Sequence, residues 1–506
     1  MLAASALAIA LAFLPTQALA TTRTLSSSIS HEAGRSGIHG KTTLSLSGPS
    51  GALSDITTAG GWSIEGCSSD WSSGAAQVTI VCTGTQAQQA VCSQLFDDGG
   101  AVDTIVKLPE NCGTGLVARV VSSVDITTAT KFLRGPETHA VVLDYNFSAI
   151  KTQRGSVTFS ISTSQSTTTS DSGSELAAAK RWEIGQMFDL PPVSVDKSYN
   201  LFQASISCPA IGNGAGFSAA VSVDTNVHVN ANIALGFKVT GTIIPPAIDT
   251  MQILGTLNGS ASGEFIVNAQ ATGTFDTGLV PLYEVVIAGV DIPGILQIGP
   301  KFGVYGRLNA NLGVEALVKA GVAWTFPDVE VAFPQNSGAS KASAIQTLTP
   351  LVVSLDPTAT ATGVVTAGLT PRLSVGIDIL SGLAEATVYL DVTASAELDL
   401  NIEGHAHAEA PIDVGTGEVD TSATGGASGC ASLDVGVDIT VGARGAIPPI
   451  FDEEISYTIY AKHIEVFNEC FGAGDAATST RARSLERRAF TCPALGLKDL
   501  LELIHV

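Results

Sequence analysis

Residues 217–243 alternate between apolar and polar side chains without a change of register, and this run constrains the fold more than any other feature. A period of two places alternate side chains on opposite faces of a β-strand. A two-residue hairpin would keep the alternation, but the Asn-Gly, Asp-Gly or Gly-Gly pair that such turns favour is absent here. We therefore expect one very long strand with an apolar and a polar face.

The same alternation recurs along the second half of the chain, and Asn258-Gly259 predicts a hairpin turn within its weakest repeat. The repeats are 253–275, 301–326, 361–379, 384–410 and 431–443. They predict an all-β fold with an elongated antiparallel sheet of about six or seven very long strands, either rolled on its apolar face or packed as a sandwich. Residues 279–299 are apolar on both faces, so we expect them to cross or plug the apolar side of the sheet.

The N-terminal part has shorter runs rich in β-branched residues and bounded by Gly, Ser, Asn and Asp. They predict a small all-β domain, with a short helix over Gln86–Leu95. The predicted strands are Thr42–Leu46, Gln77–Cys82, Val117–Val124 and Ala140–Phe147.

Five segments are expected along the chain. Residues 1–20 are uncharged after Met1 and end in Ala18-Leu19-Ala20, which is typical of a signal peptide. The expected order is the signal peptide, an N-terminal all-β domain with disulfides (21–160), a Ser/Thr-rich linker (161–189), the long-strand domain (190–472) and a basic segment with a short C-terminal helix (473–506).

Two basic clusters lie in stretches that are poor in large apolar residues. Lys180-Arg181 and Arg487-Arg488 are either protease processing sites or solvated charges.

The chain has eight cysteines, and in a secreted chain an even number indicates disulfides. No Cys-x-x-Cys pair is present, which argues against a zinc site built from paired cysteines. Pairing of neighbours predicts the bonds Cys67–Cys82, Cys92–Cys112 and Cys430–Cys470, and leaves Cys208–Cys492.

The charge of the chain limits the partners that it can bind. The net charge of −22 leaves no basic surface for nucleic acid, and no transmembrane span is expected after the leader. Asn146-Phe147-Ser148 and Asn258-Gly259-Ser260 are N-glycosylation sequons or chance tripeptides.

No catalytic motif of a known hydrolase or nucleotide-binding class occurs in the sequence, and no cofactor is expected. Glu403, His405, His407 and Glu409 would share one face of a strand, as zinc ligands or as part of a solvated polar row. Trp62 and Trp71 would either stack on sugar rings or pack beside disulfides in the core.

Two segments resemble a family of secreted fungal two-domain proteins of unknown function, in which a cysteine-containing N-terminal β-domain precedes a C-terminal long-strand domain. The segments are CTGTQAQQAVCSQLFDDGGAVDTIVKLPENCGTG with the following VVSSVDITTATKFL, and IPGILQIGPKFGVYGRLNANLGVEALVKAGVAW. The resemblance implies secretion and the two-domain fold, but no activity.

Three functions remain open at this point. The first is a non-catalytic extracellular or cell-wall protein with a structural or surface-interaction role, whose partner would be a cell-wall glycan. The second is a carrier that holds an apolar small molecule on the apolar sheet face. The third is a secreted hydrolase whose site is dispersed over distant segments. The lack of a catalytic motif favours the first.

Overall fold

The computed structural model describes most of the chain from residue 22 to residue 471. The described ranges are 22–33, 38–96, 100–127, 136–151, 154–165, 187–208, 217–287, 289–334, 340–346, 349–355, 361–403, 407–412, 422–424 and 428–471. The predicted signal peptide, both basic pairs (Lys180, Arg181, Arg487 and Arg488), His405 and Cys492 lie outside these residues.

The fold is all-β, as predicted, and the chain divides into two compact units. Unit 1 comprises the described residues within 1–27, 45–159 and 242–247. Unit 2 comprises those within 28–44, 160–241 and 248–506.

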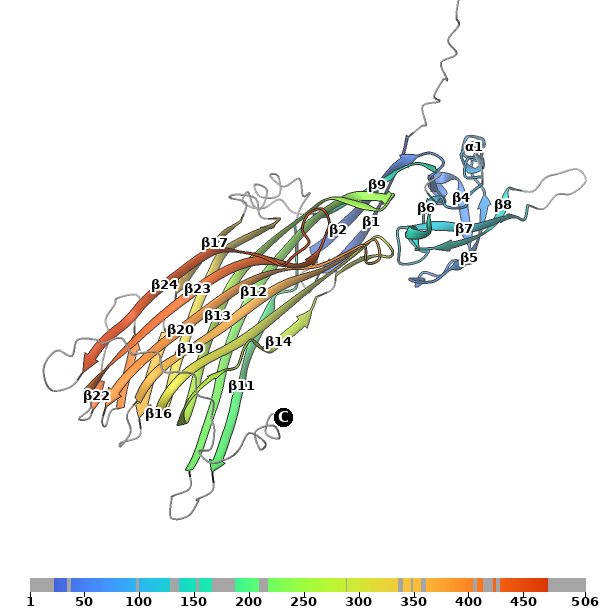
Figure 1. Ribbon diagram of the computed structural model, residues 1–506. Coiled ribbons are helices and arrows are strands. Elements are labelled where there is room, and N and C mark those ends of the chain that lie inside the picture. Colours follow the sequence, from blue (N-terminus) through green and yellow to red (C-terminus); the bar gives the residue numbers. More distant parts are fainter. Residues whose placement is uncertain are drawn as a thin grey trace, which may run out of the picture. The chain divides into compact units, whose positions relative to one another are not determined.

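One 18-stranded sheet contains the long strands, which run side by side in Figure 1. Its strands are β1 (Thr22–Ala33), β2 (Ile38–Pro49), β9 (Val157–Gln165), β10 (Phe188–Asp189), β11 (Val193–Cys208), β12 (Phe217–Ile244), β13 (Ala247–Asp276), β14 (Val280–Val286), β15 (Val290–Ile292), β16 (Leu296–Phe333), β17 (Lys341–Gln346), β18 (Thr349–Leu355), β19 (Ala361–Ile379), β20 (Ala384–Glu403), β21 (His407–Ile412), β22 (Ser422–Thr424), β23 (Ser428–Ala446) and β24 (Ile455–Phe471). β9 extends to Gln165, so the first residues of the predicted linker are strand.

The alternation predicts these strands because the period-two apolar positions are the buried ones. On β12, Val227, Val229 and Phe237 are no more than 2% exposed, whereas the intervening His228 and Asn230 are exposed. Burial of apolar side chains along one face is therefore what stabilises strands of 28 to 38 residues on β12, β13 and β16.

The sheet rolls on its apolar face and is not a stack of two separate sheets. β19 pairs with the first half of β16, and β20, β23 and β24 follow in order, while β17 pairs with the second half of β16. β17 and β24 are therefore far apart in the order of strand pairing. They are nevertheless close in space, because Tyr460 of β24 donates a hydrogen bond to the carbonyl oxygen of Ala344 in β17 at 3.5 Å. Among the described residues, this contact brings β24 next to β17, so the sheet curls around its apolar face.

Residues 279–299 do not plug the apolar side, so that prediction is wrong. They form β14, β15 and the start of β16, and both short strands pair with β16. Val286 is 76% exposed, whereas Val290, Ile292 and Leu296 are at most 3% exposed, so the segment adds to the core as part of the sheet and does not cross it. An apolar residue on the solvent face gives the same sequence pattern as one buried on both faces.

Asn258-Gly259 is a bulge within β13 and not a hairpin turn. The register with β16 shifts between Leu257 and Gly259, and the strand continues to Asp276. A Cβ on Gly259 would lie 2.0 Å from the carbonyl oxygen of Asn230. Glycine is needed here for close approach to the neighbouring backbone.

Unit 1 contains a six-stranded sheet in the order β3-β6-β7-β8-β5-β4. Its elements are β3 (Leu53–Asp55), η1 (Thr58–Gly60), β4 (Trp62–Glu65), β5 (Ala76–Cys82), α1 (Gln86–Ser93), β6 (Ile105–Lys107), β7 (Val117–Asp125), β8 (Thr138–Asp144) and η2 (Phe147–Ala149). The predicted helix is confirmed as α1, and a capping box between Thr85 and Gln88 explains where it begins.

The predicted N-terminal disulfide pairing is wrong: the bonds are Cys67–Cys112 and Cys82–Cys92. Cys82 pairs opposite Trp62 in the β4–β5 hairpin, whereas Cys67 lies beyond the other end of β4. Five residues of extended chain separate the two positions by roughly 16 Å, and a disulfide tolerates at most about 7 Å between Cα atoms.

The C-terminal cysteines are described in part. Cys430 is disulfide-bonded, and Cys470 lies directly opposite it in the register of β23 and β24. Cys208 ends β11, and its expected partner Cys492 lies outside the described residues.

Candidate functional site

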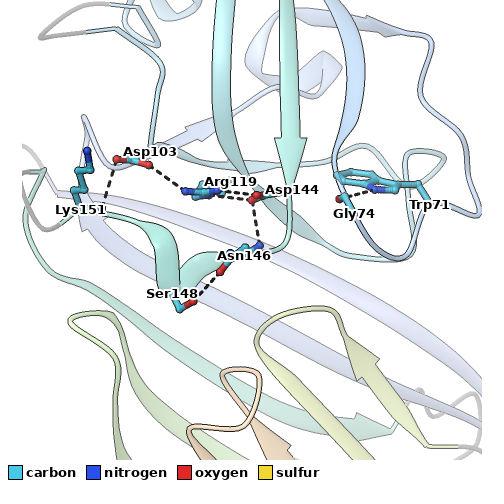
Figure 2. Close-up of polar contacts among 8 residues, drawn as sticks. All are labelled: Trp71, Gly74, Asp103, Arg119, Asp144, Asn146, Ser148 and Lys151. Carbon is cyan, nitrogen blue, oxygen red and sulfur yellow. Dashed lines mark hydrogen bonds and ion pairs between the residues drawn. The ribbon is translucent and has the colours of Figure 1, made fainter.

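The two tryptophans proposed as sugar platforms lie in the core of unit 1. Trp62 is 1% exposed and packs edge-on against Phe96 and His139. Trp71 stacks on Tyr145 with ring centroids 4.3 Å apart. Its indole Nε1 donates to the carbonyl oxygen of Ser73 and to that of Gly74, and Figure 2 shows the bond to Gly74. Neither ring offers a free face to a sugar, which corrects this candidate.

The four candidate zinc ligands do not share one strand. Glu403 is the last residue of β20, whereas His407 and Glu409 lie in β21, which pairs with β18 and β22. Within the described part of the chain, no group of three or more His, Cys, Asp or Glu side chains is arranged to hold a metal ion.

The two sequon asparagines are both exposed. The Ser148 hydroxyl donates to Asn146 Oδ1 at 2.7 Å, and the Asn146 backbone N–H donates to Asp144 Oδ1 (Figure 2). Asn258 lies in the β13 bulge, where its amide nitrogen is oriented to donate to the carbonyl oxygens of Leu257 and Pro327.

A groove of about 660 Å³ on the polar face of the large sheet is the best candidate site. Four glycines line it, and we call it the glycine trough. Gly299 and Gly376 are direct partners in the β16–β19 register. A Cβ on Gly299 would meet no atom within 4 Å, so the space above this part of the floor is open. The lining residues are Val286, Ile287, Gly289, Val290, Asp291, Gln297, Ile298, Gly299, Gly376, Ile377, Asp378, Glu385, Ala386, Thr387, Arg444 and Gly445.

The trough runs across the strands, because register places its residues in two transverse rows. The floor row is Gly299, Gly376, Thr387 and Arg444, on β16, β19, β20 and β23. The parallel row, which we call the acidic row, is Asp291, Gln297, Asp378 and Glu385, on β15, β16, β19 and β20. Neighbouring strands are about 4.8 Å apart, so the acidic row presents polar side chains at that interval.

A second set of polar side chains, which we call the tyrosine ladder, lies next to the trough along the same strands. The Arg372 guanidinium lies 5.2 Å from the ring centroid of Tyr305 and 5.1 Å from that of Tyr389. The same guanidinium bonds both carboxylate oxygens of Asp391, at 2.5 and 2.6 Å. Such a bidentate, aromatic-flanked arginine holds its plane in one orientation.

Glycines allow the two tyrosine rings to lie close to the sheet. A Cβ on Gly303 would lie 2.8 Å from the Tyr305 ring, and a Cβ on Gly442 would lie 2.4 Å from the Tyr389 ring. The ladder meets the trough at Arg444, which donates to Glu454 at 2.9 Å. Tyr389 also donates to Glu454, at 3.4 Å.

The pKa of Tyr305 is raised to about 12. The main cause is burial, and the second is the hydrogen bond that Tyr305 donates to Glu284 at 2.7 Å. The free tyrosine value is about 10. The neutral phenol therefore stabilises the fold fully below about pH 10, and that contribution is lost as pH rises through the folded value.

We expect Glu284→Gln to lower the pKa of Tyr305, because the carboxylate charge that opposes phenolate formation is removed while an acceptor oxygen stays in place. The measurement is an alkaline titration of phenolate absorbance, in which the Tyr305 signal is the difference between each protein and its Tyr305→Phe derivative. An unchanged Tyr305 pKa in Glu284→Gln would contradict the proposed electrostatic contribution.

Sequence reasoning missed the trough. The only signal was the presence of Gly299 and Gly376 at polar-face positions of alternating runs, where neighbouring positions carry Gln, Lys, Ser and Asp. The alternation of side chains along a strand does not predict which glycines on different strands become neighbours, because that depends on the register of strand pairing.

Among the described residues, no helix is long and apolar enough to cross a membrane. No curated protein and no solved structure matches the chain. Residues 264–472 match a domain of unknown function (DUF7223). The matched segment contains the tyrosine ladder and the whole glycine trough.

Proposed function

We propose that this chain is a secreted fungal protein without catalytic activity, associated with the cell wall, which binds a cell-wall glycan in the glycine trough. The observation that carries the proposal is an open, glycine-floored groove bordered by carboxylates, an arginine and oriented tyrosines. Shape and polar groups of this kind suit a polyhydroxylated ligand, which combines flat ring faces with many hydrogen-bonding groups.

The packing of the described interior side chains supports this function over transport of an apolar ligand. Apolar side chains that face inward from several strands, such as Val229, Phe302 and Leu398, are 0–2% exposed. Side chains that lined an empty apolar cavity would remain accessible to a water-sized probe, so the packing around these described residues leaves little room for an acyl chain.

The proposal includes the export and processing steps expected from the sequence. These are removal of residues 1–20, N-glycans at Asn146 and Asn258, and protease cleavage at Lys180-Arg181 or Arg487-Arg488. Intact-mass measurement of protein from culture medium, before and after glycan removal and reduction, tests all three. A full-length, unmodified mass would contradict them.

Filling the trough is expected to abolish glycan binding without harming the fold. Gly376→Thr introduces a Cβ whose nearest neighbour would be 3.7 Å away, which is ordinary contact. A β-branched residue in place of a strand glycine is expected to raise the free energy of unfolding, by up to about 1 kcal/mol. The bulk itself would occupy the floor on which the ligand lies.

The matched control is Gly368→Thr. Gly368 lies on β19, as does Gly376, and its Cβ would also have its nearest neighbour at 3.7 Å, but it does not line the trough. Co-sedimentation with insoluble glucan and chitin is the assay, and thermal unfolding monitors the fold. Loss of binding in both variants, or in neither, would contradict a site in the trough.

A glycoside hydrolase is the second candidate, and one observation favours it. Asp378 and Glu385 are direct cross-strand partners that both line the trough. Retaining glycosidases use two carboxyl groups about 5–5.5 Å apart, and side chains directly opposite in an antiparallel pair meet this spacing at Cβ. The test is release of reducing ends from glucan or chitin by the unmodified protein and by Glu385→Gln. Release that is abolished in the variant would show hydrolysis in place of binding alone.

A further inference from the structure

We infer that the ligand of the trough is a cationic polymer of amino sugars, such as deacetylated chitin. This inference rests on the proposed function and specifies its glycan. It follows from the charges that line the trough, from the pairing of the cations around it and from the spacing of its acidic row.

The trough is negatively charged. Asp291, Asp378 and Glu385 line it, and Arg444 is the one cationic side chain among the described lining residues. Arg444 is held by Glu454 at 2.9 Å, and Glu454 lies outside the lining set. The guanidinium is therefore paired with a carboxylate that lies outside the acidic row.

The neighbouring cations are paired elsewhere as well. Lys301 contacts Glu284 at 2.7 Å, and Arg372 contacts Asp391. Asp378 accepts a hydrogen bond from the backbone N–H of Gly382, which brings no positive charge. Partial burial raises the pKa of Asp291, because its charged form is desolvated without a cation beside it.

A ligand that brings ammonium groups would supply the missing positive charge. An anionic polymer would be repelled both by the trough and by a chain of net charge −22. A neutral glycan would gain hydrogen bonds but would leave the carboxylates of the acidic row without a counter-charge.

The spacing favours a sugar polymer over a lysine-rich peptide. Asp378 and Glu385 lie on adjacent strands, and Asp291 lies two strands from Asp378. Asp291 and Asp378 are therefore separated by two strand spacings, roughly 9.6 Å, which is close to the length of two hexoses in an extended β-linked polymer, after which the amino groups return to the same side. Side chains on one face of an extended peptide recur at about 6.6 Å, which does not match.

Calorimetric titration of the full-length protein with hexamers of glucosamine, of N-acetylglucosamine and of β-linked glucose tests the inference. We expect the glucosamine hexamer to bind about tenfold more tightly than the other two at low salt, because each ammonium–carboxylate contact is a charge-assisted hydrogen bond. Added salt should reduce this advantage.

The variant Asp378→Asn/Glu385→Gln is expected to lose the preference for glucosamine. Its control is Glu397→Gln/Asp399→Asn, which removes the same charge from exposed positions of β20 outside the trough. The control should bind as the unmodified protein does, apart from a small general effect of net charge.

The outcomes separate this inference from the proposed function. Binding of the acetylated or glucose hexamer as tight as that of glucosamine, and lost in Gly376→Thr, would overturn the amino-sugar inference and leave glycan binding standing. Binding of no hexamer would overturn both. Equal binding of hexalysine, with the same dependence on Asp378 and Glu385, would identify a basic peptide as the partner and overturn the sugar polymer.

Discussion

Replacing Arg119 by methionine is expected to destabilise unit 1 by about 3–5 kcal/mol, the loss typical of a buried ion pair that is deprived of one partner. Arg119 Nε and Nη2 donate to the two carboxylate oxygens of Asp144 at 2.9 and 2.7 Å, and Nη1 contacts Asp103 at 3.5 Å (Figure 2). The Arg119 and Asp144 side chains are 10% and 17% exposed. The hydrogen bonds to Asp144 are the main reason that the pKa of Arg119 is raised.

The cost arises because Arg119→Met leaves Asp144 charged and partly desolvated without its cation. Arg119→Lys keeps the charge but loses the bidentate geometry, so we expect a smaller loss. Hydrogen exchange of backbone amides in β7 and β8 reads the local stability of unit 1 in the full chain.

Arg307→Met is the matched control. Arg307 makes the same two-point contact to Asp276, at 3.3 and 2.8 Å, but the two side chains are 53% and 41% exposed. Exposed pairs contribute at most about 1 kcal/mol, so exchange in β13 and β16 should change little. Equal losses in the two variants would show that burial is not the source of the effect at Arg119.

The sequence predicts the strands of this protein well because burial on one sheet face leaves a period of two. The run 217–243 becomes β12, which ends at Ile244, and no turn interrupts it. The run 384–410 does not form a single strand. β20 ends at Glu403, and His407 begins β21, which pairs with β18. Alternation reports the face on which a residue lies but not its partner strand.

The partner strand decides the site, and this is why the trough could not be predicted. Asp291, Gln297, Asp378 and Glu385 form one row only because β15, β16, β19 and β20 pair in this register. The turn between β19 and β20 has a local signal in the Ser381-Gly382 dipeptide, and Leu380, Ser381 and Gly382 all have positive φ there. The pairing of β19 with β16, across residues 334–360, has no comparable local signal.

The cysteines illustrate the same limit, and their pairing leads to the second prediction of large effect. Spacing alone favours neighbours, but the hairpin β4–β5 places Cys67 and Cys82 at opposite ends. The bond Cys67–Cys112 therefore spans 45 residues, and Cys82–Cys92 spans 10. Loop-closure entropy predicts that loss of the long bond costs roughly 4 kcal/mol and loss of the short bond roughly 2.7 kcal/mol.

The double variants Cys67→Ala/Cys112→Ala and Cys82→Ala/Cys92→Ala, unfolded in urea, measure this difference through the amides of β5, β7 and β8. Packing has to be separated from cross-linking, because Cys82 and Cys92 are 4% and 0% exposed and their removal also leaves small cavities. Each variant is therefore compared with the unmodified chain under reduction, where only the packing loss remains, and that loss is subtracted. If the bond Cys82–Cys92 then proved the costlier to remove, the unfolded chain would have to retain structure around Cys67 and Cys112, and the entropic account would fail.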